Sequence, residues 1–316
     1  MGQSPVGAAG QSSRVKGDLL SDLNIRHELN APLAMSTWYG VGGTARVLAH
    51  PSSVQQLSAL AARCREQNVP VYVLGAGANL LVSDNGVDGV VVKLDDPAWR
   101  QVQRQADGVT VGCGYDLMQL VRQTARDGLR GLQVLAGIPA SVGGAVRMNA
   151  GGSFGDIGKT VRRLQVMDAT GHVYYRHRDD LAFSYRKTNI TAPYILDVEF
   201  DLTADDPQAL VQEFKEIFLF KRNSQPLAAQ SAGCAFKNPP ADEDGQSTSA
   251  GALIDRAGLK GYRVGGAEVS IKHANFVVTN SERCTASDVL ALLEHVQQTV
   301  SDRFGVMLDR EIVVWA

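Results

Sequence analysis

The fold of this chain is decided by the stretch Val69-Pro-Val-Tyr-Val-Leu-Gly-Ala-Gly-Ala-Asn-Leu-Leu-Val-Ser-Asp-Asn-Gly-Val-Asp-Gly-Val-Val-Val92. It begins with a valine-rich run that is typical of a strand and continues into the glycine loop Gly75 to Asn79. Beyond the loop, an apolar run from Leu80 and a turn at Asp84-Asn-Gly86 lead into a second valine run without any helical period. The stretch therefore predicts the order strand, loop, strand.

This order excludes the most familiar nucleotide-binding loops. A Rossmann phosphate loop opens into a helix whose N-terminus faces the pyrophosphate, and it needs a third glycine where Leu80 stands. The chain also contains no G-x-x-x-x-G-K-[ST] and no H-E-x-x-H, so P-loop and zincin chemistry have no support. Any dinucleotide must therefore be bound by a different fold.

On either side of this stretch, four segments place apolar residues at helical spacing. Ser52 or Ser53 could cap the first of them, and Thr285-x-x-Asp288 resembles a capping box before the last. Strand signals dominate between the second and third helices, which indicates a mixed α+β chain. The predicted helices are Ser53 to Gln67, Tyr115 to Asp127, Asp206 to Arg222 and Ser287 to Phe304.

The composition is that of a globular protein with a small-molecule partner. The 316 residues are 44% hydrophobic and 20% charged, which suggests about two or three domains. A formal net charge of −2 gives no field that would hold nucleic acid or a membrane surface, and no apolar run approaches the roughly twenty residues of a membrane span. Four widely separated cysteines signal neither a metal site nor disulfides, so we expect no bound metal and a reducing, cytoplasmic location.

Two segments concentrate glycine and small residues, namely Gly75 to Asn79 and Gly137 to Ala145, the second continuing to Gly152. Consecutive exposed backbone N–H groups in such segments bind phosphate oxygens, and the absence of Cβ atoms lets a diphosphate approach closely. Either segment alone would more often be a tight turn in β-rich structure. The presence of both favours a cofactor cradle.

Further blocks follow one another in a characteristic order. The chain reads Thr37-Trp-Tyr-Gly-Val-Gly-Gly43, Val73-Leu-Gly-Ala-Gly-Ala-Asn-Leu-Leu-Val82, Gly128-Leu-Arg-Gly-Leu-Gln-Val-Leu-Ala-Gly-Ile-Pro139, Val142-Gly-Gly-Ala145, Ser184-Tyr-Arg186, Gln225-Pro226, Ser231-Ala-Gly-Cys-Ala-Phe-Lys-Asn-Pro239, Gly251-Ala-Leu-Ile-Asp255, Gly258-Leu-Lys-Gly261 and His273-Ala-Asn-Phe276. Together these blocks resemble the MurB family of UDP-N-acetylenolpyruvoylglucosamine reductases over nearly everything after residue 25. The short link from Pro239 to Gly251 resembles the shorter, second type of this family, which lacks a substrate-covering loop.

The resemblance implies an α+β fold, with a vanillyl-alcohol-oxidase or PCMH-type FAD-binding domain of two α+β subdomains and a C-terminal substrate domain. We expect FAD-binding subdomains at 21–95 and 96–222 and a substrate-binding domain at 223–316, whose last strand, about 308–316, returns to the FAD domain. The Gly/Ser/Gln-rich start, residues 1–20, is expected to be a disordered tail. Non-covalent FAD is implied at Gly75, Ala76, Gly77, Ala78, Asn79, Leu80, Pro139, Ala140, Ser141, Gly143 and Gly144.

The implied activity is the NADPH-dependent reduction of UDP-N-acetylglucosamine enolpyruvate to UDP-N-acetylmuramate, in bacterial peptidoglycan synthesis, by a monomer. Arg186 and Glu311 are implied to polarise the substrate carboxylate, and the residue at position 234 to protonate the intermediate. Without the resemblance, Arg186 would be interpreted as a surface charge and Glu311 as a solvated strand residue. Because no Rossmann fingerprint exists, we expect NADPH and the sugar to alternate in one cleft.

Position 234 departs from the family pattern, because it carries cysteine where serine is usual. A thiol is a stronger acid than an alcohol, so Cys234 can still donate the proton, with Ser231 as the alternative donor. Beside cationic groups, the thiol is further expected to ionise and to react with peroxide or thiol reagents. Other departures are Gln133 for glutamate, Ala140 for glycine, and Gly152-Ser-Phe154 for Ala-Tyr or Ala-His.

Contacts to the substrate diphosphate or the nicotinamide phosphate are implied for Tyr185, Arg222, Lys237, Asn238 and His273. His273 alone would more often be a structural histidine, because nothing around it has metal-ligand or triad spacing. Two other functions stay open: another FAD-dependent oxidoreductase on the same fold, and an inactive nucleotide-sugar binding protein. Covalent FAD in the first would need a histidine or cysteine that the glycine segments lack.

Overall fold

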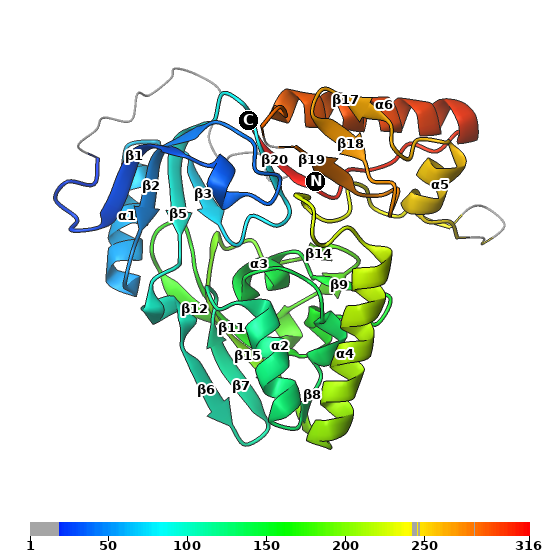
Figure 1. The fold of residues 1–316 in the computed structure, drawn as a ribbon. Helices are drawn as coiled ribbons and strands as arrows, with labels where there is room; N and C mark the ends of the chain where they lie inside the picture. The colour runs from blue at the N-terminus through cyan, green and yellow to red at the C-terminus, as the bar shows by residue number, and fades with distance from the viewer. Residues whose placement is uncertain (1–18, 242–244, 246, 281) are drawn as a thin grey trace.

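The computed structural model describes residues 19–241, 245, 247–280 and 282–316, which form three regions (Figure 1). The first is a four-stranded sheet in the order β1-β2-β5-β3, in which β1 is antiparallel to β2 and the other pairs are parallel. Helix α1 connects β2 to β3. The elements are β1 (Arg26–Pro32), β2 (Thr44–His50), α1 (Val54–Glu66), β3 (Val71–Leu74) and β5 (Val87–Lys93).

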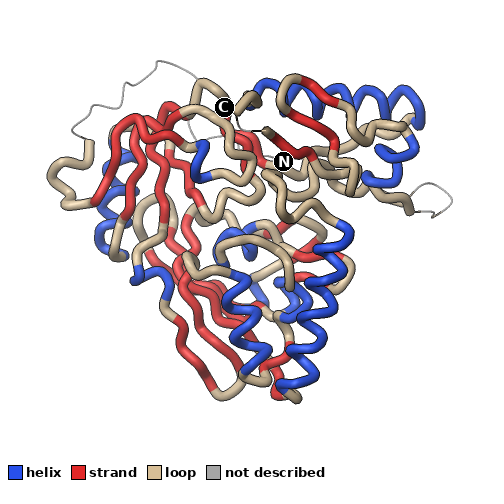
Figure 2. The backbone as a smooth tube through the Cα atoms, viewed as in Figure 1, coloured by secondary structure: helices blue, strands red, loops and turns tan. Residues whose placement is uncertain are grey.

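The second region is an antiparallel five-stranded sheet in the order β12-β11-β15-β7-β6, with helices on one side (Figure 2). Its elements are β6 (Val102–Gln105), β7 (Gly108–Gly112), α2 (Leu117–Arg126), α3 (Val142–Arg147), β11 (Val161–Met167), β12 (Val173–His177), β15 (Tyr194–Asp201) and α4 (Pro207–Ser224). Short pairs join β8 (Leu129–Arg130) to β16 (Thr203–Ala204), β9 (Gly151–Gly152) to β10 (Gly155–Asp156), and β13 (Phe183–Ser184) to β14 (Lys187–Thr188).

The third region lies at the upper right of Figure 1, apart from the five-stranded sheet. It contains α5 (Ala250–Arg256), β17 (Arg263–Val264), β18 (Ala267–Val269), β19 (Val277–Thr279) and α6 (Ala286–Phe304). The chain then returns to the first region, where β20 (Val313–Trp315) pairs in parallel with β4 (Leu80–Val82). Single 3₁₀ turns occupy Ala34–Ser36, Pro97–Arg100, Gln133–Leu135, Ile157–Lys159 and Arg178–Asp180.

The four predicted helices are confirmed, and the first and the last of them begin at the expected caps. Ser53 Oγ accepts the Gln56 N–H at 3.2 Å. Thr285 and Asp288 form a complete capping box before α6. Such caps satisfy N–H groups that have no partner within a helix. The predicted strand, loop, strand order is confirmed as well, as β3, Gly75 to Asn79, and β4.

Buried apolar residues form one core shared by the two sheets, a second core in the third region, and a smaller third core between the first sheet and β4. The second core also takes up Tyr39, Val41 and Leu81 from the N-terminal half, so the regions pack as one body. The predicted disordered tail covers residues 1–20, and its residues 1–18 lie outside the described residues. Leu19 and Leu20, however, are 3% and 2% exposed in the first core, so the predicted boundary at residue 20 is wrong. None of the described helices is long and apolar enough to cross a membrane.

Candidate active site

A cavity of about 2220 Å³ is lined by all three regions. It exceeds the roughly 300–1,000 Å³ that suits one drug-sized ligand, so it has room for a cofactor and a second molecule. Its lining includes both glycine segments, the β13–β14 hairpin, residues 231–238 and the C-terminal strand. The two segments that were predicted to cradle a cofactor therefore share one cavity with the predicted catalytic residues.

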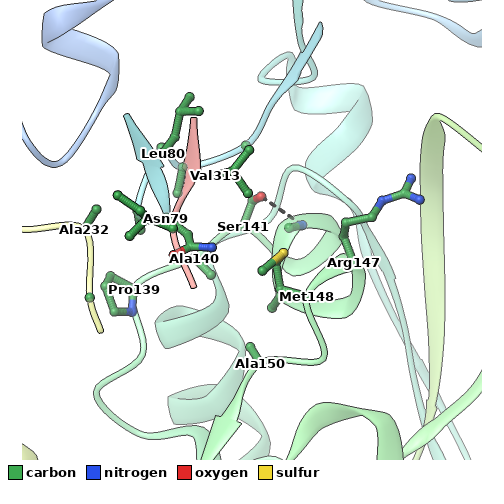
Figure 3. A pocket seen from close by; sticks show the side chains of 18 of the residues that line it. Asn79, Leu80, Pro139, Ala140, Ser141, Arg147, Met148, Ala150, Ala232 and Val313 are labelled. Atoms are coloured by element: carbon green, nitrogen blue, oxygen red, sulfur yellow. Dashed lines mark hydrogen bonds between the residues drawn. The ribbon is translucent and has the colours of Figure 1, made fainter. Parts of the chain in front are cut away.

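The two glycine segments approach each other directly. A Cβ built on Gly75 would lie 2.6 Å from Ser141 Oγ, so any larger residue at position 75 would displace this hydroxyl. Ser141 caps α3 by accepting the Gly144 N–H at 3.3 Å, the dashed line in Figure 3. Figure 3 also shows Asn79 and Ala140 in the lining of this cavity, together with Val313 of β20, whose N–H donates to the Asn79 backbone oxygen.

The cradle fits the diphosphate of FAD. Within the part of the chain that the structure describes, the backbone N–H groups of Ala76, Gly77, Ala78, Ala140 and Ser141 donate no hydrogen bond. Free N–H groups beside small residues are what phosphate oxygens require. Gly143 was also predicted to bind FAD, but its N–H is not free. It donates to the Cys113 carbonyl at 2.8 Å and so takes part in packing within the protein.

Asn79 ties the first glycine segment to the C-terminal segment around Glu311. The Asn79 side-chain amide donates to the backbone oxygen of Glu311 at 3.2 Å, and the Asn79 backbone carbonyl accepts the Val313 N–H at 3.0 Å. These bonds hold the C-terminal strand against the glycine loop. The position of Glu311 is thereby fixed relative to the cofactor segment.

Arg186 and Glu311 form an ion pair at the cavity, although 125 residues separate them. The Arg186 Nε donates to Glu311 Oε1, and their side chains are only 16% and 10% exposed. Arg186 sits in the turn between β13 and β14 with φ +54°, a conformation that costs energy for any residue except glycine. Glu311 Oε2 is buried without a partner among the described residues, so it is available to a ligand.

Cys234 is held next to this pair by backbone pairing on both sides of its segment. Cys234 forms an antiparallel bridge with Phe276, and the Glu311 N–H donates to the Ala235 carbonyl at 2.8 Å. The thiol lines the cavity and belongs to a free cysteine. The three predicted catalytic residues are thus neighbours in space.

Electrostatics keep the Cys234 proton in place. Burial raises the pKa of the thiol to about 12, Glu311 adds to the rise and Arg186 opposes it. Burial likewise raises the pKa of Glu311, with Arg186 opposing. The expectation that Cys234 ionises beside cationic groups is therefore wrong, because desolvation and the neighbouring carboxylate outweigh Arg186.

Alkylation of Cys234 by iodoacetamide is expected to be slow near neutral pH and to accelerate about tenfold per pH unit up to at least pH 10. The reason is that the thiolate is the reactive form and the pKa is raised. Peptide mass spectrometry at a series of pH values would measure the rate at this one thiol, with glutathione as the reference. A rate that levels off near pH 8 would show that the pKa is not raised.

The predicted substrate contacts divide into those at the cavity and one outside it. The Tyr185 ring lies 5.1 Å from the Arg186 guanidinium, and its hydroxyl accepts the Asn238 N–H at 3.3 Å. Tyr185, Lys237, Asn238 and His273 all line the cavity, whereas Arg222 is exposed and is not among its described lining residues. Burial lowers the pKa of His273, so the neutral imidazole is favoured.

Sequence patterns assigned no definite role to three side chains or pairs of side chains that line the cavity. Lys221, next to Arg222, is buried in the cavity, and its Nζ has no hydrogen-bond partner within the described ranges. Ser231, the alternative proton donor, also has a buried hydroxyl without a partner in the described part of the chain. Phe154 and Phe220 pack edge to face at 5.5 Å and stay 40% and 55% exposed, so they lie where the cavity opens to solvent.

The fold and the cradle define a flavin-binding protein of the PCMH type, and comparisons with known proteins agree. Residues 45–175 match the FAD binding domain family, and residues 225–315 match the C-terminal domain of UDP-N-acetylenolpyruvoylglucosamine reductase. A reductase of that name from Desulfosudis oleivorans is 42% identical over 302 residues, which cover 92% of this chain and 94% of the relative. The Bacillus subtilis reductase is 35% identical and covers 90% and 92%.

A solved structure leads to the same family. The reductase MurB from Thermus caldophilus superposes with a TM-score of 0.77 at 36% identity, covering 93% of this chain and 99% of that one. The chain belongs to the MurB family of UDP-N-acetylenolpyruvoylglucosamine reductases, and it is an FAD-binding oxidoreductase of that family.

Proposed function

We propose that this protein reduces UDP-N-acetylglucosamine enolpyruvate to UDP-N-acetylmuramate, with NADPH as reductant and non-covalently bound FAD, in peptidoglycan precursor synthesis. The observation that carries the proposal is the Arg186–Glu311 pair beside Cys234, in the cavity that also contains the FAD cradle. The similarity to reductases of this name over more than nine-tenths of the chain supports it.

The reaction adds two electrons and two hydrogens across the carbon–carbon double bond of the enolpyruvyl ether. When bound, FAD supplies the hydride to the terminal carbon, since no side chain can supply one. The neighbouring carbon then carries negative charge that is delocalised onto the carboxylate. The residues of this chain must bind that carboxylate and give the carbon its proton.

Arg186 and Glu311 suit the first task. Arg186 provides a fixed positive charge that binds the substrate carboxylate. The attraction between the two becomes stronger as negative charge builds up on the carboxylate in the transition state. Because the pKa of Glu311 is already raised by burial, the approach of a second carboxylate favours its protonated form. The unpartnered Oε2 could then donate a hydrogen bond to the substrate carboxylate.

Cys234 suits the second task. Its raised pKa means that the thiol carries its proton throughout the physiological range. A carbanion next to a carboxylate is a much stronger base than a thiolate, so the transfer is downhill once hydride has arrived. The resulting thiolate would be reprotonated from solvent or from a neighbouring acid.

The size and unity of the cavity support alternation of NADPH and the sugar at one face of the flavin. Of the proposed contacts, all except Arg222 line one cavity, and the chain has no Rossmann motif for a separate nicotinamide site. We therefore expect parallel double-reciprocal plots with substrate inhibition in steady-state assays of NADPH oxidation. Intersecting plots without inhibition would contradict a shared site and would require both ligands to bind together.

A further inference from the structure

Lys221 is a buried cation at the cavity that the proposed chemistry does not use. It lies in the last turn of α4, is 6% exposed, and its Nζ is buried without a hydrogen-bond partner among the described residues. Its aliphatic stem packs against the second glycine segment, where a Cβ on Gly137 would come within 3.0 Å of Lys221 Cδ. Gly137 has φ +83°, so this close approach depends on glycine.

An unpaired ammonium in such a place is costly, because buried charges are normally paired. Burial lowers the pKa of Lys221 to about 8, and the positive charge of Arg186 contributes. At neutral pH the charged form of Lys221 still predominates. The free protein therefore holds a cation that has no counterion among the residues that the structure describes.

No protein carboxylate fills this role in the described part of the chain. Glu311 is paired with Arg186, and Glu213 of α4 is paired with Arg130 and Gln133. Lys221 and Arg186 are close enough to influence each other's charge, and both line the cavity. Two cations that face one cavity favour a ligand with negatively charged oxygens.

We propose that Lys221 binds an oxyanion of the UDP-sugar substrate, either a phosphoryl oxygen or the enolpyruvyl carboxylate. This assignment rests on the proposed function, and it makes Lys221 a substrate-binding residue. It also explains why the chain buries a lysine at this position, since a ligand anion supplies the missing counterion. Arg222, the neighbouring residue that the sequence favoured, is exposed and does not line the cavity.

The test measures equilibrium binding of two sugars to the oxidised FAD-containing protein at pH 7, by flavin absorbance and calorimetry. UDP-N-acetylglucosamine carries the diphosphate alone, and UDP-N-acetylglucosamine enolpyruvate adds the carboxylate. The variants are Lys221→Gln and the matched control Lys215→Gln, which makes the same change at an exposed position of the same helix. FAD content and melting temperature verify that each variant is folded.

We expect Lys221→Gln to weaken binding by about tenfold or more, as for loss of a charge-assisted hydrogen bond, and Lys215→Gln to stay within about twofold of wild type. Weaker binding of both sugars assigns the lysine to the diphosphate, and weaker binding of only the enolpyruvyl sugar assigns it to the carboxylate. Unchanged affinity for both sugars would overturn the proposal, and so would loss of FAD in place of loss of sugar. If the wild type binds neither sugar, the proposed function itself is wrong.

Discussion

Replacing Cys234 with alanine is expected to slow the oxidation of the reduced flavin by the enolpyruvyl sugar by about 10²- to 10⁴-fold, the range of a general acid. Reduction of the flavin by NADPH should keep its wild-type rate, because that step needs no proton from this thiol. Anaerobic stopped-flow absorbance measures the two half-reactions separately. The effect should therefore appear in one half-reaction only.

Two further variants make this result specific. Cys234→Ser restores a proton-bearing oxygen of nearly the same size and should recover much of the rate. Cys284→Ala removes another free thiol, in the third region outside the cavity lining, and should leave both half-reactions unchanged. A wild-type rate of reoxidation in Cys234→Ala would exclude the thiol as donor and would point to Ser231, whose hydroxyl is buried in the same cavity.

Breaking the Arg186–Glu311 pair is expected to lower kcat/KM for the enolpyruvyl sugar by about 10²- to 10³-fold, as for removal of a group that stabilises charge in the transition state. Arg186→Gln removes the cation and leaves Glu311 buried without its partner, at a cost to stability of about 3–5 kcal/mol. Steady-state kinetics and thermal unfolding would separate the two effects. Glu311→Gln keeps the shape of the carboxylate and tests the charge alone.

A comparable ion pair outside the cavity serves as the control. Arg163 Nη2 lies 2.7 Å from Glu199 Oε2 on the five-stranded sheet, and neither residue is among the described residues that line the cavity. Arg163→Gln should change stability without a large change in kcat/KM. An equal loss of activity in both variants would show that the Arg186 effect comes from general destabilisation.

The local features of the fold could be predicted because their causes are local. Ser53, Asp206 and Thr285 each accept N–H groups within three residues, so a cap is visible in the sequence around it. The strands after the glycine loop were equally visible, β4 in the apolar run from Leu80 and β5 in its valine pattern. The tail boundary was not, because Leu19 and Leu20 are held by packing against distant segments of the core.

The arrangement of the candidate site could not be predicted from local sequence patterns, because its residues are far apart in the sequence. Arg186 and Glu311 meet across 125 residues, and only their resemblance to a family linked them. Lys221 and Arg222 are adjacent, but consecutive helical residues point about 100° apart, and only the packing of α4 decides which one faces the cavity. The raised pKa of Cys234 depends on burial that no sequence pattern shows.

The sequence also did not predict which residue covers the bound substrate, because the link after Pro239 is too short to contain a substrate-covering loop. The structure places the Phe154–Phe220 pair where the cavity opens, on the β9–β10 turn and the end of α4. These rings come from segments that are far apart in the sequence. Their contact follows from the position of α4 beside the second sheet.

The measurement that tests the central claim most directly is an anaerobic titration of the wild-type holoenzyme, followed by flavin absorbance. NADPH should bleach the flavin, and stoichiometric UDP-N-acetylglucosamine enolpyruvate should then restore the oxidised spectrum, while UDP-N-acetylglucosamine, which lacks the double bond, should not. If NADPH bleaches the flavin but the enolpyruvyl sugar never restores it, the reductase function is contradicted and a different flavin-dependent oxidoreductase activity must be sought.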